Sequence, residues 1–366
     1  MSEATADLLD RLQEEAAALF PVSQRDAGAF SRRRETLVGR MNQSVQGGGR
    51  LPGLEKEGSR QEMEENHRNH ARFMDTVFAL GDPGMLVRTI PWVYRTYVAH
   101  GLDPEYFPAA LEEWARLLED ELAGDAATLL PVYEWMRARH PEWLRLSRAL
   151  PPGGHLPEDD LSPLRRELLD RLLDGDVQSA MEVARRGRED AGGVLELYAE
   201  VLQPVLYEVG RMWEEGRISV AHEHLASSIV TRILVQEGAS VPLPASRRRA
   251  VVTAAASDLH EMGAWMVADA LRMKGWRVDF LGANTPVEDV VDLARRSKAD
   301  LVAISVTMPF HLPAVKELVD KLRVDPLAKS TKVVVGGQAF LSSPDIWKSL
   351  GADGMAMDAR QIEAVL

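Results

Sequence analysis

Short apolar runs alternate with helical patterns in the last third of the chain. Three of these runs, at residues 249–256, 301–307 and 332–337, are rich in Val, Ile and Ala and lack the polar alternation of a half-exposed strand. Such runs are typical of parallel strands that are buried on both faces. Because helical segments separate them, residues 248–366 are predicted to form a doubly wound, flavodoxin-like α/β domain around a parallel five-stranded sheet.

Helical periodicity dominates the residues before that domain. Residues 1–150 are predicted to form a mainly helical N-terminal domain, and residues 158–243 a four-helix bundle. The proline- and glycine-rich residues 151–155 are predicted to link the two. Residues 31–60 are polar and rich in glycine, which predicts an exposed connection inside the first domain. The fold class is therefore expected to be α plus α/β.

The composition excludes several kinds of partner and site. The chain of 366 residues has a net charge of −13 and no evident basic face, so nucleic acid is not expected to bind directly. No apolar run is long enough to cross a membrane and the N-terminus lacks a signal-peptide pattern, which predicts a cytoplasmic protein. With no cysteine, the chain cannot form a disulfide, a thiolate metal site or a thioether bond to a chromophore.

The first of the three apolar runs leads into Asp258-Leu259-His260-Glu261-Met262-Gly263. A loop at the carboxyl end of a parallel strand is where ligands bind in such sheets, so His260 is placed to act as a metal ligand. Asp258 is expected to accept the second ring N–H of His260 and to make the other nitrogen more basic. Gly263 allows close approach of a large group. A solvent-facing loop histidine is the alternative for this motif taken alone.

The other two runs end in small residues. Ser305 and Thr307 finish one, and Gly336-Gly337 finish the other, which predicts a slot between neighbouring strands with hydroxyl partners and a glycine floor. The order of these motifs over residues 248–366 resembles the cobalamin-binding domain family. That resemblance implies that His260 binds the cobalt from below in place of the cofactor's own base, and that this base enters the slot.

The four-helix bundle is expected to cover the upper face of the cofactor. Trp213 ends its third helix, and Glu223 and His224 lie in the first turn of the fourth, which Ser219 can cap. An indole and a carboxylate suit the adenine and ribose of an adenosyl group. An exposed tryptophan with solubilising charges is the alternative.

A Trp followed ten residues later by Glu-His resembles the cap of adenosylcobalamin photoreceptors. In the light-sensing repressors of that group a histidine that binds the upper face of cobalt after illumination follows the Trp, but Glu214 stands here. His222, His224 or water therefore remain as alternatives for the upper ligand.

The N-terminal domain has no basic recognition helix of the kind that begins those repressors. With this cap, the architecture resembles the photocobilins, which implies adenosylcobalamin and a non-covalent biliverdin. Side chains suited to a linear tetrapyrrole are concentrated in one stretch: His67, His70, Arg72, Trp92, Tyr94, Arg95, Tyr97 and His100. The alternative is that these residues form the core of the domain without any ligand.

The resemblance predicts a light sensor rather than an enzyme, with a homodimer that changes on illumination. Because Leu366 falls inside the expected last helix, a further effector domain or a separate effector chain is also expected. One alternative is a corrinoid shuttle protein for a methyltransferase, which would have no evident use for Trp213 with Glu223 and His224. Another is an adenosylcobalamin mutase subunit, which would need a partner chain to supply the substrate barrel.

Overall fold

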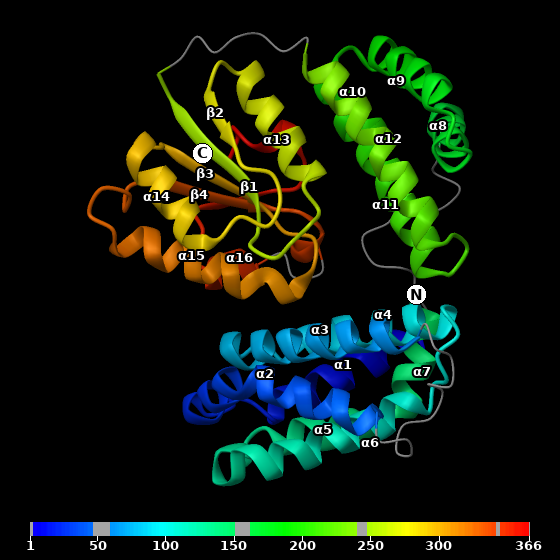
Figure 1. Ribbon diagram of the computed structural model, residues 1–366, viewed down its shortest axis with the longest axis vertical. Coiled ribbons are helices and arrows are strands. Elements are labelled where there is room, and N and C mark those ends of the chain that lie inside the picture. The colour runs from blue at the N-terminus through cyan, green and yellow to red at the C-terminus, as the bar shows by residue number, and fades with distance from the viewer. Residues whose placement is uncertain (1–2, 47–58, 151–161, 240–246, 342–344, 366) are drawn as a thin grey trace. The chain divides into compact units, whose positions relative to one another are not determined.

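The computed structural model describes residues 3–46, 59–150, 162–239, 247–341 and 345–365. They form two compact units, Met1–Gly153 and Gly154–Leu366 (Figure 1). The predicted linker at 151–155 and the predicted bundle limits at 158 and 243 lie outside the described residues. No helix in the described ranges is both long and apolar enough to cross a membrane.

The N-terminal unit is helical, as predicted. Over residues 3–46 and 59–150 its α-helices are α1 Glu3–Ala18, α2 Gln24–Gln46, α3 Ser59–Leu80, α4 Gly84–Ala99, α5 Tyr106–Leu122, α6 Leu130–Ala138 and α7 His140–Ala149. They enclose a core of aromatic and aliphatic side chains, of which Trp114, Tyr133 and Trp143 are the largest that are fully buried.

The prediction of an exposed connection over residues 31–60 is wrong for its first half, which belongs to α2. Phe30, Leu37 and Met41 are fully buried along one side of this helix, and the Phe30 ring meets Phe78 of α3 edge-on at 5.3 Å. Their spacing of seven and four residues keeps them on one helical face. A narrow apolar stripe is therefore enough to dock a helix whose overall composition is polar.

The second unit begins with the predicted four-helix bundle. Its segments are α8 Pro163–Leu173, α9 Val177–Ala191, a third helix made of α10 Val194–Leu197, a π-turn at Tyr198–Leu202 and α11 Gln203–Glu214, and finally α12 Val220–Gly238. Ser219 precedes α12 but does not cap its backbone, contrary to expectation. Its hydroxyl instead lies 2.8 Å from Nδ1 of His222, because that imidazole competes for the same oxygen.

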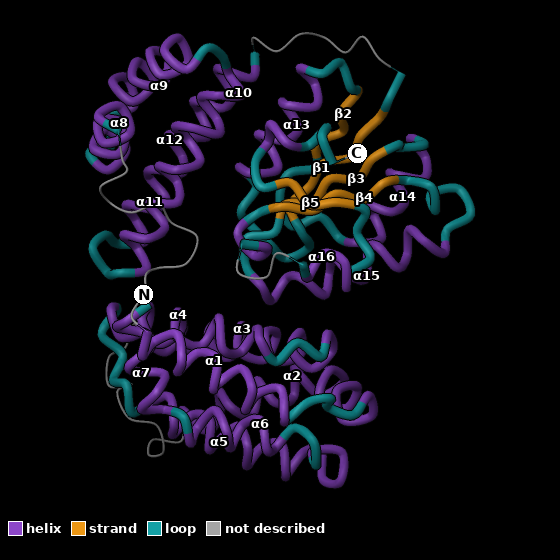
Figure 2. Tube along the Cα trace, turned by 180° about the vertical axis from the view of Figure 1, so that it is seen from behind, coloured by secondary structure: helices purple, strands orange, loops and turns teal. Residues whose placement is uncertain are grey.

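The predicted flavodoxin-like α/β fold is confirmed. Its strands are β1 Arg249–Ala254, β2 Arg277–Phe280, β3 Leu301–Ser305, β4 Lys332–Gly336 and β5 Gly354–Ala356. All four pairings are parallel and the order across the sheet is β2-β1-β3-β4-β5, which Figure 2 shows as adjacent strands. The order reverses next to β1, and ligands bind at such a switch point.

The helices of this domain cover both faces of the sheet. α13, Met262–Met273, packs on β1 and β2 on the side of the bundle, and α14, Val287–Ser297, and α15, Leu312–Val324, pack together on the other side (Figure 1). Ile233 and Leu234 of α12 share one hydrophobic cluster with Ala268 and Leu271 of α13. The bundle and the sheet are thus joined by a continuous apolar core.

Candidate cofactor site

The strand register gathers the predicted small residues into one row. Ala254, Ser305, Gly336 and Ala356 are direct partners across β1, β3, β4 and β5 at the carboxyl edge of the sheet. The predicted strands are one or two residues longer than the observed ones, so Thr307 and Gly337 belong to the loops that leave this edge. The edge therefore offers little side-chain volume where a ligand would enter.

Asp258 fixes the loop that carries His260. Its side chain is fully buried, and Oδ1 accepts bonds from Nδ1 of His260 at 2.7 Å and from the His260 backbone N–H at 3.1 Å. Oδ2 accepts the backbone N–H of Thr307 at 2.8 Å. One carboxylate thus orients the imidazole and ties its loop to the end of β3. Thr307 takes part through its backbone amide, whereas the prediction concerned its hydroxyl.

The imidazole of His260 presents its other nitrogen outward. A carboxylate only accepts hydrogen bonds, so Nδ1 must carry the hydrogen, and Nε2 holds a lone pair whenever the ring is neutral. The side chain is 57% exposed. Burial lowers the pKa of His260, but the hydrogen bond and charge of Asp258 and the charge of Glu223 outweigh it and raise the pKa. The site thus holds an oriented imidazole whose free nitrogen could bind a metal in competition with protons.

The glycines at the site are required by the fold itself. A Cβ on Gly263 would lie 3.0 Å from Oγ of Ser305, and one on Gly336 would lie 2.6 Å from the carbonyl oxygen of Ala356. Gly337 has φ +102° and passes even closer to the carbonyl of Val306. The backbone contacts of Gly336 and Gly337 and the contact of Gly263 with the Ser305 hydroxyl explain the motif without any reference to a ligand, and the glycines keep the edge free of side chains.

The cap residues lie on two consecutive helices. Trp213 is half-buried on the last turn of α11, and Glu223 and His224 are on the first turn of α12. Oε1 of Glu223 accepts from the Ser227 hydroxyl at 2.8 Å, and Oε2 lies 2.8 Å from Nδ1 of His224. Glu223 is therefore held in place, while His224 is 75% exposed.

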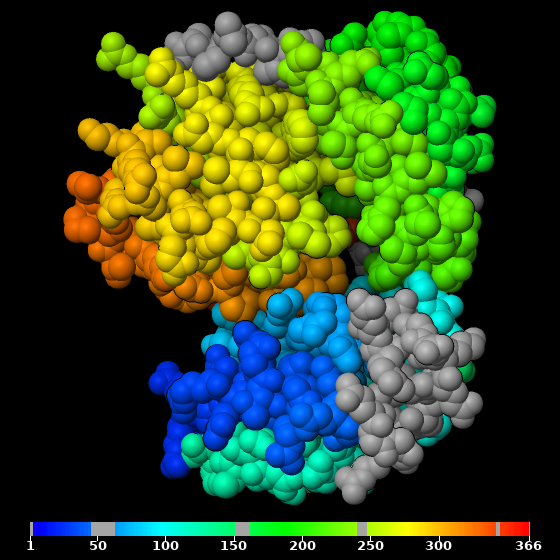
Figure 3. All heavy atoms as spheres, viewed as in Figure 1, coloured from blue at the N-terminus to red at the C-terminus, as the bar shows by residue number. Residues whose placement is uncertain are grey.

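The cap and the His260 loop belong to one electrostatic environment. The charge of Glu223 contributes to the raised pKa of His260, after the larger effects of Asp258. Figure 3 shows the surface hollowed between the green atoms of the bundle and the yellow and orange atoms of the α/β domain. The imidazole of His260 and the carboxylate of Glu223 therefore interact electrostatically.

A residue that the sequence analysis missed supports the His260 loop from its other side. Asn284, in the loop between β2 and α14, bonds both to Ser257 and to Asp258. The only signal for it in the sequence is an Asn two residues after Gly282 in a loop that follows a strand.

Most of the residues predicted to hold a bilin contact other side chains or backbone groups of the N-terminal unit. His67 is buried between Asn42 and Tyr106, at 2.6 and 2.7 Å, and Nε2 of His70 lies 3.3 Å from the Tyr133 hydroxyl. The remaining predicted residues range from buried to exposed: Arg72, Trp92, Tyr94, Arg95, Tyr97 and His100.

Two of them have clear structural roles. Tyr94 stacks on Phe107 at 3.9 Å and bonds His140 at 3.0 Å, and Arg95 donates to the carbonyls of Ser147 and Leu150 at 3.0 and 2.8 Å. These contacts match the alternative of a core without ligand.

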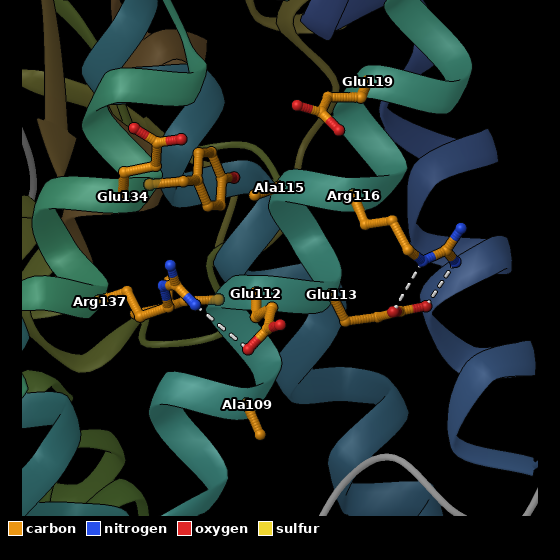
Figure 4. Close-up of a pocket in the computed structure, with 10 residues that line it drawn as sticks. Ala109, Glu112, Glu113, Ala115, Arg116, Glu119, Glu134 and Arg137 are labelled. Carbon is orange, nitrogen blue, oxygen red and sulfur yellow. Dashed lines mark hydrogen bonds and ion pairs between the residues drawn. The ribbon is translucent and has the colours of Figure 1, made fainter.

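The same unit has a surface groove of about 540 Å³ between α5 and α6 (Figure 4). Its polar wall carries Glu112, Glu113, Glu119 and Glu134 beside Arg116 and Arg137, and the dashed lines mark pairs of Arg137 with Glu112 and of Arg116 with Glu113. None of the eight residues predicted to hold a bilin lines it. Its carboxylates would repel the propionates of a linear tetrapyrrole.

Both parts of the second unit match known families. Residues 248–366 match a family model described as a B12 binding domain, and residues 164–236 match a second model with the same description. These matches cover the α/β domain and the bundle above it, and they indicate a corrinoid cofactor. The site fits that group, because His260 is an exposed imidazole that Asp258 orients and that could hold the cobalt.

Similar proteins include both corrinoid proteins and a repressor. Dimethylamine corrinoid protein 3 of Methanosarcina acetivorans is 24% identical over 208 residues, which cover 56% of this chain and 96% of that protein. The HTH-type transcriptional repressor CarH of Myxococcus xanthus is 33% identical over 156 residues, which cover 43% of this chain and 52% of the repressor.

Among solved structures, the monomethylamine corrinoid protein of Methanosarcina barkeri aligns over 54% of this chain and 94% of its own, with 24% identity and a TM-score of 0.47. Two consecutive parts of the chain, the helical cap at residues 164–236 and the α/β domain at residues 248–366, thus each match a B12 binding domain model.

Proposed function

We propose that this protein is a light sensor that holds adenosylcobalamin between His260 and the cap, and that it signals rather than catalyses. The observation that carries the proposal is Glu223, a carboxylate fixed by Ser227 on the cap and close enough to His260 to raise its pKa. Adenosylcobalamin, when bound, supplies a cobalt–carbon bond that light breaks.

Each side chain has a distinct part in holding the cofactor. His260 would hold the cobalt through its free ring nitrogen, and Asp258 keeps that imidazole oriented and basic. The row of small residues through Ser305 and Gly336 admits the cofactor's displaced base. Above the ring, Trp213 offers a stacking surface and Glu223 an acceptor for hydroxyl groups, with His224 beside it.

The proposal is supported by the resemblance of Trp213, Glu223 and His224 to the cap of adenosylcobalamin photoreceptors and by the similarity to CarH. Its test is the absorption spectrum of the purified protein loaded with adenosylcobalamin, recorded in darkness and after green light. A light-dependent spectrum and tighter binding of adenosylcobalamin than of methylcobalamin are expected. Trp213→Ala should reduce that preference, since a methyl group offers nothing to stack on. A protein that binds both forms equally would contradict the proposal.

A second candidate function is that of a corrinoid carrier for a methyltransferase. It is favoured by the dimethylamine corrinoid protein, since the alignment spans 96% of that protein and the bundle and sheet are both included in the B12-binding matches. Equal affinity for the two cofactor forms, with turnover of methylcobalamin by a methyltransferase, would select this function.

The signal is proposed to be a change in assembly. Release of contacts at Trp213 and Glu223 would alter the cap, and assembly is linked to any ligand that binds one state better than another. A homodimer is expected in at least one state, acting on a further domain or on a separate effector. Sedimentation velocity in darkness and after illumination tests this, and identical profiles would contradict it.

The most specific part of the proposal is that the N-terminal unit binds biliverdin. Its support is the resemblance to photocobilins and the aromatic, arginine and histidine side chains between His67 and His100. Reconstitution of cobalamin-loaded protein with biliverdin should give a red-absorbing complex that loses its pigment on denaturation, because the chain has no cysteine. The absence of a red band after reconstitution would contradict biliverdin binding by this unit.

A further inference from the structure

We infer that Asn284 is a positioning residue for the lower cobalt ligand, because it clamps the Asp258–His260 loop from the neighbouring strand. This inference rests on the proposed binding of cobalamin through His260. It adds a residue from the β2–α14 loop to a site otherwise built from the ends of β1, β3 and β4.

Asn284 contacts the loop at two successive residues. Its side-chain Oδ1 accepts the backbone N–H of Ser257 at 3.0 Å, and its own backbone N–H donates to the carbonyl oxygen of Asp258 at 3.0 Å. Asp258 is thereby held from the two strands that flank β1. Its carbonyl oxygen accepts from Asn284 in the loop after β2, and its carboxylate accepts from Thr307 in the loop after β3.

The clamp joins two residues in the left-handed region. Ser257 has φ +66° and Asn284 has φ +52°. This conformation is unfavourable for most residues, and asparagine tolerates it better than most side chains. Ser257 has no such tolerance, so its N–H bond to Asn284 favours the strained turn over a relaxed one.

The turn at Ser257 determines where the imidazole lies. The His260 ring and its backbone N–H both bond the same oxygen of Asp258, so a shift of Asp258 moves Nε2 with it. Without the amide of Asn284, the loop is expected to sample other turns, and His260 is then aligned below cobalt for only part of the time.

Two substitutions separate this role from a general effect on folding. Asn284→Gly keeps the left-handed backbone but removes the side-chain acceptor, whereas Asn284→Asp keeps an acceptor in the same place. Lys298→Gly is the matched control, because Lys298 also has φ +52° but lies at the C-terminus of α14. All variants are compared by thermal unfolding before cobalamin is added.

The readouts are the dissociation constant for adenosylcobalamin and the EPR spectrum of the bound cobalt(II) form, in which an axial imidazole nitrogen splits the cobalt lines. Asn284→Gly is expected to weaken binding by about 10–100-fold, the range typical of partners that orient a metal ligand, and to lose the splitting in part. Asn284→Asp and Lys298→Gly should keep both the affinity and the splitting.

A folded Asn284→Gly variant with unchanged affinity and full splitting would overturn the inference. Equal losses in Asn284→Gly and Lys298→Gly would also overturn it, because they would trace the effect to backbone flexibility in the domain. A failure of the proposed cobalamin binding through His260 gives a different result. The unmodified protein would then show no nitrogen splitting, or the splitting would persist in the His260→Ala variant.

Discussion

The hydroxyl of Tyr198 donates a 2.9 Å hydrogen bond to Oδ2 of Asp269, and both side chains are buried. Tyr198 lies in the π-turn of the cap, and Asp269 lies on α13, the helix that begins two residues after His260. Oδ1 of Asp269 accepts from Arg272 at 2.9 Å, and Gly238 at the end of α12 comes so close that a Cβ would lie 2.9 Å from Oδ2. This bond joins the cap to the helix behind the ligand loop.

Tyr198→Phe is therefore expected to loosen the junction between cap and sheet. It leaves Oδ2 of Asp269 buried without its hydroxyl donor, which costs about 1–3 kcal/mol. Urea unfolding should show the loss in the second unit, and hydrogen exchange should quicken in α12 and α13. Asp269→Asn should lose at least as much, because its amide offers one acceptor oxygen to two donors, Tyr198 and Arg272. Unchanged exchange in Tyr198→Phe would mean that apolar packing alone holds the junction.

Asp258→Ala should weaken corrinoid binding by about 10–100-fold, because it removes the group that orients the ligating imidazole. The structure adds a second effect, since the bond that ties the loop to Thr307 is lost as well. His260→Ala is expected to be more severe and to leave water as the lower ligand. Titration with adenosylcobalamin and the spectrum of the complex measure both. A His260→Ala variant with the affinity and spectrum of the unmodified protein would remove the assigned ligand.

Gly337→Ala should destabilise the α/β domain. An alanine at φ +102° is strained by about 1–3 kcal/mol, and its Cβ would meet the carbonyl of Val306. Gly210→Ala is the matched control, since it has no atom within 4 Å of an added Cβ and lies inside α11, where alanine is preferred by up to about 1 kcal/mol. Thermal unfolding should move down for the first variant and slightly up for the second. Equal shifts would contradict the backbone explanation.

Acid should destabilise the N-terminal unit through its buried histidines. Burial, with a smaller effect of Arg68, lowers the pKa of His67 to about 4, and burial, with a smaller effect of His67, lowers that of His70 to about 3. Below the ordinary histidine pKa near 6.5, these two histidines become protonated in the unfolded chain but stay neutral in the folded unit until the pH reaches their lowered pKa values. Stability present above pH 6.5 is therefore lost as pH falls, by about 3 kcal/mol at pH 4 from His67 alone.

Chemical unfolding of the protein between pH 7.5 and 4.5 measures this loss. His67→Gln should flatten the pH dependence, because glutamine binds no proton in this range. A His67→Gln variant with the same slope as the unmodified protein would assign the acid sensitivity to other groups.

Several features of this protein follow from the sequence alone, because they depend on local geometry. The Asp258-x-His260 spacing permits a carboxylate to reach the ring two residues on, and the 2.7 Å bond is present. The apolar runs that end near Ser305 and Gly336 are strands with the predicted parallel arrangement. Helical spacing located the bundle, because the period of the apolar side chains does not depend on what they pack against.

Other features required the tertiary structure, because they join segments that are distant along the chain. The register that aligns Ala254 with Ser305 and Gly336, and the bond from Thr307 to Asp258, depend on how the strands pair. No local pattern marks the left-handed turn at Asn284.

The docking of α2 and the bonding of the histidines show the same dependence. The polar composition of residues 31–46 conceals a buried stripe, and His67 looks like a ligand-binding group until Asn42 and Tyr106 are found on either side of it. Residue type and spacing determine what a side chain can do, whereas the partners that satisfy it are decided by packing, which brings together groups that the sequence keeps apart.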